Sequence, residues 1–395
     1  MTGERITTAE MLARLIALDT TSAKSNLALI EAVADYLASH GIAARLVHNA
    51  TRDKANLFAT IGPEGDGGIA LSGHSDVVPV AGQDWSTDPF QAVTENGRVY
   101  GRGSCDMKGF IAAALALVPE MIEAEPRTPL HLVFSYDEEL GCVGVTTLIA
   151  EIAKSLPKPG LAIIGEPTGM QLVNANKGIF AFETELTGLE AHSSATHLGV
   201  SAIFHGAELI GFIDRMAAEM AERGPFAHDF DPPYTSFNVG VIEGGTAINI
   251  IPKSCTIAWE FRPVPGADAE AIKARIAAWV ADDLLPRMRK KFPEAAVITT
   301  QGAAAPPLVP SADSPAEALV RKLTGANRAT TVAFATEAGH FQATGIPAVI
   351  IGPGSIDQAH KPDEYVEASQ LDACEDFLRK VIAHAASEAP KDPGS

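Results

Sequence analysis

The segment Ile69-Ala-Leu-Ser-Gly-His-Ser-Asp76 joins a short apolar run directly to a histidine and an aspartate. Three other short apolar runs, at residues 130–135, 161–164 and 348–351, are likewise flanked by glycine, proline or charged residues. Such runs are typical of central strands in a sheet that helices cover on both faces. Helical and strand signals alternate around them, so the sequence predicts an α/β fold.

A different pattern interrupts this one in the middle of the chain. Its order is a strand (179–186), a helix (198–220), two strands (236–242 and 254–261), a helix (267–289) and a strand (296–300). The order βαββαβ predicts a ferredoxin-like α+β unit that is complete in itself. We therefore expect an inserted domain at residues 178–302 and a first domain made of residues 1–177 and 303–395.

Composition and charge exclude several classes of function. The chain has 395 residues, and 49 acidic against 30 basic residues give a formal net charge of −19. This charge repels phosphate backbones and anionic lipids, so we expect no nucleic-acid or membrane partner. The N-terminus lacks the pattern of a secretory signal, and the four cysteines form no C-x-x-C pair, as expected of a cytoplasmic protein with reduced thiols.

Residues that bind metals concentrate in five short segments. These are Gly-His-Ser-Asp at 73–76, Gly-Arg-Gly-Ser-Cys-Asp-Met-Lys-Gly at 101–109, Tyr-Asp-Glu-Glu at 136–139, Ile-Gly-Glu-Pro-Thr at 164–168 and Gly-Pro-Gly-Ser-Ile-Asp-Gln-Ala-His at 352–360. Ligands of open α/β sheets bind beyond the carboxyl ends of the strands, so these segments can converge. Two imidazoles and three carboxylates suit two divalent ions that share one carboxylate, and such a pair can polarise a carbonyl and activate water for hydrolysis.

Taken in order, these segments resemble the motifs of the M20 family of metallopeptidases and deacylases, and the resemblance covers nearly the whole chain. It implies a zinc-hydrolase domain with a mixed central sheet, an inserted lid and dimerisation domain, and a cis peptide bond after Asp106. It also implies two Zn²⁺ per subunit, with Co²⁺ as an alternative metal. His74 and Glu166 would bind one ion, Glu139 and His360 the other, and Asp106 both.

Two further residues take roles from the same motifs. Asp76 lies two residues beyond His74, where it would accept the imidazole N–H and fix the tautomer that binds metal. Glu138 would be the general base beside the ligand Glu139. Cys105 invites a zinc–thiolate alternative, although five ligands already suffice. An intact Glu138 argues against a second alternative, a non-catalytic metal-binding assembly protein.

Three residues of the insert resemble the lid segments of the family. His192 would stabilise the oxyanion in the active site of a partner subunit, which implies a homodimer. Its alternative is an ordinary histidine of a surface turn. Asn249 and Arg262 would help to hold the substrate, and the alternative for Arg262 is a structural ion pair.

Within the family, residues 163–168, 336–338 and 352–365 are similar to those of the acetylornithine deacetylases. This similarity implies a small N-acyl amino acid as substrate, namely N2-acetyl-L-ornithine, hydrolysed to L-ornithine and acetate in arginine biosynthesis. Glu337 would then pair with the ornithine ammonium, unless it is only a carboxylate at a helix N-terminus. A succinyl-diaminopimelate desuccinylase and an aminoacylase or dipeptidase remain alternatives.

Overall fold

The computed structural model describes residues 5–387 and divides the chain into two compact units. The first unit consists of the chain up to Ala175, of Leu308–Thr331 and of the chain from Thr336 onward. The second consists of Asn176–Pro307 and Val332–Ala335. Among residues 5–387, no helix is long and apolar enough to cross a membrane.

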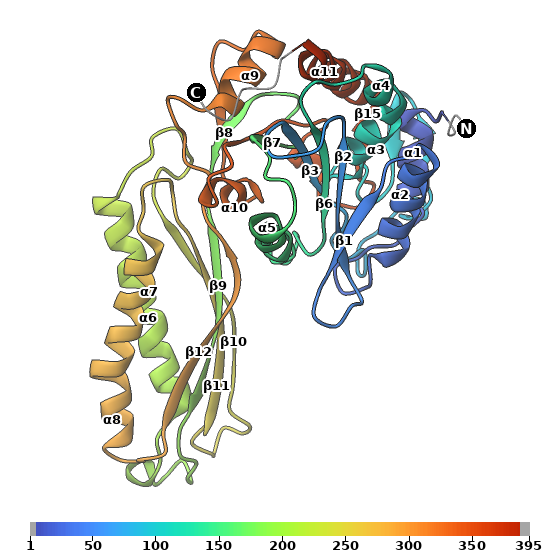
Figure 1. Ribbon diagram of the computed structural model, residues 1–395. Helices are drawn as coiled ribbons and strands as arrows, with labels where there is room; N and C mark the ends of the chain where they lie inside the picture. Colours follow the sequence, from blue (N-terminus) through green and yellow to red (C-terminus); the bar gives the residue numbers. More distant parts are fainter. Residues whose placement is uncertain (1–4, 388–395) are drawn as a thin grey trace. The chain divides into compact units, whose positions relative to one another are not determined.

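The first unit is built on an eight-stranded sheet with the order β1-β2-β6-β3-β7-β14-β8-β13 (Figure 1). The bounds are β1 Ala44–His48, β2 Ala55–Ile61, β3 Ile69–His74, β6 Leu130–Ser135, β7 Leu161–Ile164, β8 Val173–Asn176, β13 Thr330–Val332 and β14 Ala348–Ile350. The central strands β6, β3, β7 and β14 are parallel, whereas β1 and β2 pair antiparallel. The mixed α/β sheet is therefore confirmed, and its four predicted central strands are completely buried.

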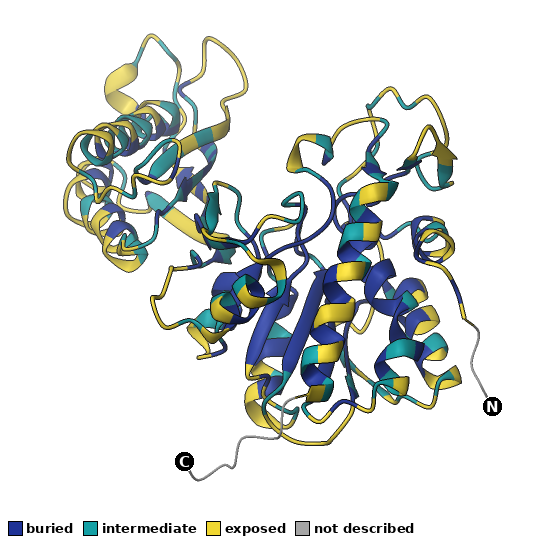
Figure 2. Ribbon diagram, turned by 90° about the horizontal axis from the view of Figure 1, so that it is seen from above, coloured by how far each residue is buried: buried dark blue, intermediate teal, exposed yellow. Residues whose placement is uncertain are grey.

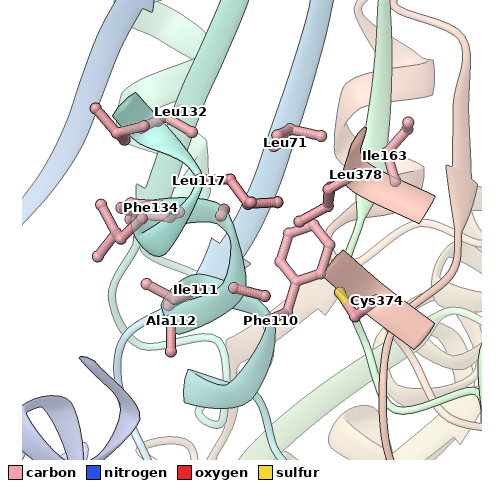
Figure 3. Packing of buried hydrophobic residues seen from close by; sticks show 14 of the residues in the cluster. Leu71, Phe110, Ile111, Ala112, Leu117, Leu132, Phe134, Ile163, Cys374 and Leu378 are labelled. Carbon is pink, nitrogen blue, oxygen red and sulfur yellow. The ribbon is translucent and has the colours of Figure 1, made fainter. Parts of the chain in front are cut away.

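Helix α3 (Lys108–Ala116) anchors the core of this unit. It packs against β3, α1 (Thr8–Ile16) and α11 (Ala368–Ser387), and its residues 108–115 are buried. Figure 3 shows Phe110 of α3 beside Cys374 and Leu378 of α11. A Cβ on Gly165 would lie 2.0 Å from the ring of Phe110, so glycine is what allows α3 to approach the end of β7 this closely.

Other helices cover the sheet with their apolar faces and expose their outer faces (Figure 2). They are α2 (Leu27–Ser39), α4 (Val118–Glu123), α5 (Val145–Lys154), α9 (Pro315–Thr324) and α10 (Ala338–Ala343). A small sheet with the order β15-β5-β4 joins β4 (Val93–Glu95), β5 (Arg98–Tyr100) and β15 (Tyr365–Glu367). The pairing of β5 with β15 brings the segment before Asp106 beside the segment after His360.

The second unit is an antiparallel sheet with the order β10-β11-β9-β12 and the predicted sequence βαββαβ. Its elements are β9 (Ile179–Thr187), α6 (Ala202–Arg223), β10 (Ser236–Gly244), β11 (Ser254–Arg262), α7 (Ala269–Trp279), the π-helical turn η2 (Val280–Leu284), α8 (Leu285–Arg289) and β12 (Ala296–Ala305). Phe182 and Trp259 stack in its core, with ring centroids 4.4 Å apart. Helix α6 begins later than predicted because the Ser201 hydroxyl accepts the Phe204 N–H and caps it there.

Candidate metal centre

The sheet brings the candidate ligands to one edge. Strands β6, β3 and β7 are adjacent and parallel, and the register pairs His74 with Ser135 and Ser72 with Ile164. Their carboxyl ends therefore lie together. His74 is the last residue of β3, Glu138 and Glu139 follow β6 directly, and Glu166 follows β7.

The carboxylate of Asp106 lies between two histidines. Its Oδ1 is 3.0 Å from Nε2 of His74, and its Oδ2 is 3.2 Å from Nε2 of His360. Nε2 of His360 also lies 3.0 Å from Glu139 Oε2, and Nε2 of His74 lies 3.9 Å from Glu166 Oε1. The contacts thus form two groups, each with one imidazole and one carboxylate of its own, and Asp106 belongs to both.

Distance alone does not separate Glu138 from the ligands. Donor atoms of His74, Asp106 and Glu139 lie within 4.8 Å of one another, and so do those of His74, Glu138 and Glu166. Glu139 differs from Glu138 in that it also contacts the second histidine, His360. Glu138 has no such contact with His360 among the ion pairs of residues 5–387.

The donor set fits divalent metal ions. Oε1 of Glu139 and Oε1 of Glu166 are buried, and within residues 5–387 neither accepts a hydrogen bond. Buried carboxylate oxygens without donors are costly unless a cation satisfies them. Imidazoles and carboxylates are ligands that Zn²⁺ and other divalent first-row metal ions bind.

The pKa values of the cluster indicate which protons such cations would displace. Burial raises the pKa of Glu139 to about 7 and raises that of Glu166 well above its usual value. Hydrogen bonds to Asp106 and Glu139 raise the pKa of His360 to about 10. Burial opposes ionisation of Asp106, but hydrogen bonds from His360 and His74 outweigh it and lower the pKa of that carboxyl. Without metal the cluster retains protons that a divalent cation would displace.

Asp76 contacts the site in a different way from the one predicted. The main-chain carbonyl of Asp76 lies 2.9 Å from Nδ1 of His74, whereas its carboxylate Oδ1 lies 3.7 Å away. The carboxylate instead accepts the main-chain N–H groups of Glu138, at 3.0 Å, and Glu139, at 3.2 Å. Nδ1 of His74 is therefore closer to the main-chain carbonyl than to the carboxylate, and the role expected for the carboxylate at this ring stays a prediction. In the described geometry the carboxylate holds the main chain of the Glu138–Glu139 pair.

Glu138 is buried beside the ligand group. It is 9% exposed, and burial raises the pKa of its carboxyl to about 8. Its Oε1 accepts a hydrogen bond from the thiol of Cys142, with 3.1 Å between sulfur and oxygen. The sequence offered one signal for this contact, because Cys142 follows Glu138 by four residues across a glycine.

Glu337 lies in the first unit, directly before α10. It is 1% exposed, and its Oε2 lies 3.4 Å from the hydroxyl of Ser72, two residues before His74. Burial raises the pKa of Glu337 to about 7. The structure thus places this carboxylate close to the candidate ligands.

The three candidate residues of the insert belong to the second unit. His192 is exposed, and its Nδ1 lies 2.8 Å from the Ser194 hydroxyl. The main-chain carbonyl of Asn249 accepts the Ser193 N–H, so His192 and Asn249 are on neighbouring segments. Arg262 forms an ion pair with Glu260 at 2.9 Å, the structural alternative for this residue.

Comparisons with known proteins agree with the motifs. The sequence profile of peptidase family M20/M25/M40 matches residues 70–384. Over 380 residues the chain is 36% identical to acetylornithine deacetylase from Myxococcus xanthus, which covers 94% of this chain and 96% of that protein. It is 34% identical to acetylornithine deacetylase from Pasteurella multocida, with the same coverage.

Solved structures show the same fold at low sequence identity. A metallo-carboxypeptidase of the M20 family from Sulfolobus solfataricus matches with a TM-score of 0.72 and 19% identity, covering 96% of this chain and 99% of that one. A dinuclear metal-binding peptidase of the same family from Bacillus subtilis matches with a TM-score of 0.63 and 13% identity, covering 95% and 98%.

Proposed function

Since this chain belongs to peptidase family M20/M25/M40, a family of hydrolases, we propose that it hydrolyses the amide bond of an N-acyl amino acid. The proposed substrate is N2-acetyl-L-ornithine, and the products are L-ornithine and acetate. The observation that carries this proposal is the Asp106 carboxylate between two imidazole–carboxylate groups, with a buried carboxylate, Glu138, beside them. Similarity to two acetylornithine deacetylases over 94% of the chain supports the substrate.

The metal centre is proposed to hold two Zn²⁺ ions, with Co²⁺ as a substitute. His74 and Glu166 would hold one ion, His360 and Glu139 the other, and Asp106 both. When bound, such a pair would polarise the scissile carbonyl and lower the pKa of bound water toward about 7. The Asp76 carboxylate keeps the main chain of Glu138 and Glu139 in place, so that one carboxylate ligates and its neighbour faces the substrate.

Glu138 is proposed as the general base. Its carboxylate would accept a proton from the attacking water and return it to the nitrogen that leaves as the new amine. In the metal-free protein burial raises the pKa of this carboxyl.

Glu337 is proposed to select the side chain of the substrate. It is a buried carboxylate, and within residues 5–387 its Oε1 has no hydrogen-bond donor. An ammonium at the end of a three-carbon side chain would supply the missing donor and the compensating charge. A substrate with an uncharged side chain would leave the carboxylate unpaired.

Residues 178–302 are proposed as a lid and dimerisation domain, with His192 serving the site of the partner subunit and Asn249 and Arg262 holding substrate. Strand β10 is at the edge of its sheet, and apolar side chains there are exposed, including Val241 at 51% and Ile242 at 49%. An edge strand with exposed apolar residues is suited to contact a second chain.

A substrate panel tests the function. The zinc-loaded protein is assayed with N2-acetyl-L-ornithine, with N-acetyl-L-norvaline, which has the same carbon chain without the ammonium, with N-succinyl-diaminopimelate and with a dipeptide. We expect the highest kcat/KM for N2-acetyl-L-ornithine, and a Glu337→Gln variant should lose most of the preference over norvaline. Faster turnover of the succinylated substrate or the dipeptide would contradict the substrate assignment.

A further inference from the structure

A further buried carboxylate, that of Glu364, contacts the main chain of the loop that carries Asp106. It is 1% exposed. Its Oε1 accepts the N–H groups of Cys105, at 2.9 Å, and Asp106, at 3.0 Å, and its Oε2 accepts that of Gly103, at 3.1 Å. Three N–H groups of the loop that carries Asp106 therefore point at one side chain.

The guanidinium of Arg102 completes this arrangement from inside the protein. It is 1% exposed and donates to Oε2 of Glu364 at 2.6 Å. The same nitrogen lies 3.3 Å from the carbonyl of Lys361, and the other terminal nitrogen donates to Oε1 of Gln83. Charge-assisted hydrogen bonds of this kind are short and about twice as strong as neutral ones.

Gln83 carries the network to the other ligand segment. Its Nε2 donates to the main-chain carbonyl of His360 at 2.9 Å. Glu364 itself follows His360 by four residues, and its carbonyl accepts the N–H of Gly101. One network, buried at Glu364 and Arg102 and more exposed at Gln83, thus joins the main chain at Asp106 to the main chain at His360.

We propose that Glu364 is a positioning residue, held by Arg102, which sets the separation between Asp106 and His360 and so the affinity of the metal site that these two residues share. The inference rests on the proposed metal centre. The site of His74 and Glu166 lacks this support, because His74 is fixed by strand β3 and Glu166 follows strand β7. Asp106 belongs to both sites but His360 to only one, so loss of the Glu364 charge should weaken the His360 site more than the His74 site.

The test compares Glu364→Gln with a matched control, Glu367→Gln. Glu367 pairs with Arg98 at 2.9 Å across β15 and β5, the same two segments, but accepts no N–H of the Asp106 loop among the hydrogen bonds of residues 5–387. Both variants and the wild type are loaded with Zn²⁺ and dialysed against increasing concentrations of a chelator. Bound zinc is counted at each step, and Co²⁺-loaded samples are followed by visible absorption.

In Glu364→Gln we expect one of two equivalents to leave with an affinity lowered by about 10- to 100-fold, while the affinity for the other falls by a clearly smaller factor. Excess metal should restore most of kcat. The control should keep both affinities. Equal weakening of both sites with a matching fall in the melting temperature of the metal-free protein would show a merely structural role, and unchanged affinities would overturn the proposal.

A second variant covers the case in which Glu364→Gln does not fold. Gln83→Leu removes only the hydrogen bonds at the edge of the network and should weaken the same site by a smaller factor. A Gln83→Leu protein with both affinities unchanged would count against the proposal. Failure of the proposed function itself is distinguishable, because then the wild type would bind fewer than two equivalents or hydrolyse no substrate of the panel.

Discussion

The thiol of Cys142 donates a hydrogen bond to Oε1 of Glu138, with 3.1 Å between the two atoms. The thiol is 1% exposed, and burial followed by the nearby Glu138 charge raises its pKa, so it remains protonated and acts as a donor. The main chain closes a tight turn between the same residues, with the Cys142 N–H donating to the Glu138 carbonyl at 2.7 Å. This contact holds one carboxylate oxygen of the proposed base.

We expect Cys142→Ala to lower kcat by about three- to tenfold without loss of metal, because one hydrogen bond to a charged group is removed. Cys142→Ser should retain most of the activity. Cys374→Ala is the matched control, since Cys374 is a buried thiol in helix α11 of the core. Steady-state kinetics with metal analysis decide the matter, and equal losses in Cys142→Ala and Cys374→Ala would speak against a specific contact.

Asp106→Ala should damage both metal sites at once, whereas His360→Ala should mainly weaken one. The reason is that, among the ion pairs of residues 5–387, only Asp106 contacts both imidazoles. Zinc titration of the two metal-free variants measures this directly. If the two variants lost the same number of equivalents with the same affinities, Asp106 would not be the shared ligand.

His131 makes the stability of the fold sensitive to acid. Nε2 of its ring lies 3.0 Å from the carbonyl oxygen of Gly67, and Nδ1 lies 2.9 Å from the hydroxyl of Thr60. One donor and one acceptor nitrogen satisfy both contacts, so the arrangement suits the neutral ring. Burial lowers the pKa of His131, and the hydrogen bond to Gly67 opposes this only in part. Below about pH 6.5 the unfolded chain therefore binds a proton that the folded chain does not. The free energy of unfolding consequently decreases as the pH is lowered.

We expect urea unfolding of the metal-free protein to show a smaller loss of stability between pH 7.5 and pH 5.5 in His131→Gln than in the wild type. The control is His228→Gln, at an exposed position of the second unit. A His131→Gln protein whose loss over this pH range equals that of the wild type would show that the ring is already protonated in the folded state.

The proposed action of His192 in a partner subunit gives a complementation test. Glu138→Gln and His192→Ala are each inactive in this scheme, but every mixed dimer has one site with neither defect. With random pairing, half the dimers are mixed and half of their sites are intact, so about one quarter of wild-type activity should return. A mixture with proven subunit exchange and no recovered activity would exclude action in trans.

The sequence predicted those features that follow from local pattern. The buried central strands were predictable because their residues are apolar. The positions of His74, Glu139 and Glu166 were predictable because these residues end or closely follow those strands. The βαββαβ insert was predictable because its strands and helices have their own amphipathic periods. Helix α6 was placed too early, since the Ser201 cap competes with a continuous apolar pattern.

Contacts to the main chain escaped prediction. The roles of Glu364 and Arg102 depend on N–H and C=O groups that every residue has, so spacing does not reveal them. The Asp76 carboxylate was assigned to the His74 ring for the same reason, whereas its acceptor atoms point at the N–H groups of Glu138 and Glu139. A charged residue inside a glycine-rich motif, such as Arg102, was the available signal.

The central claim is that Glu138 moves the proton beside an intact metal pair, and Glu138→Gln tests it most directly. Bound zinc and kcat for N2-acetyl-L-ornithine are measured on the same preparation. We predict two equivalents of zinc, as in the wild type, with kcat lowered by about 10²- to 10⁴-fold, because the amide keeps the shape but cannot accept the proton. A variant that keeps both metals and turns over at nearly the wild-type rate would contradict the account.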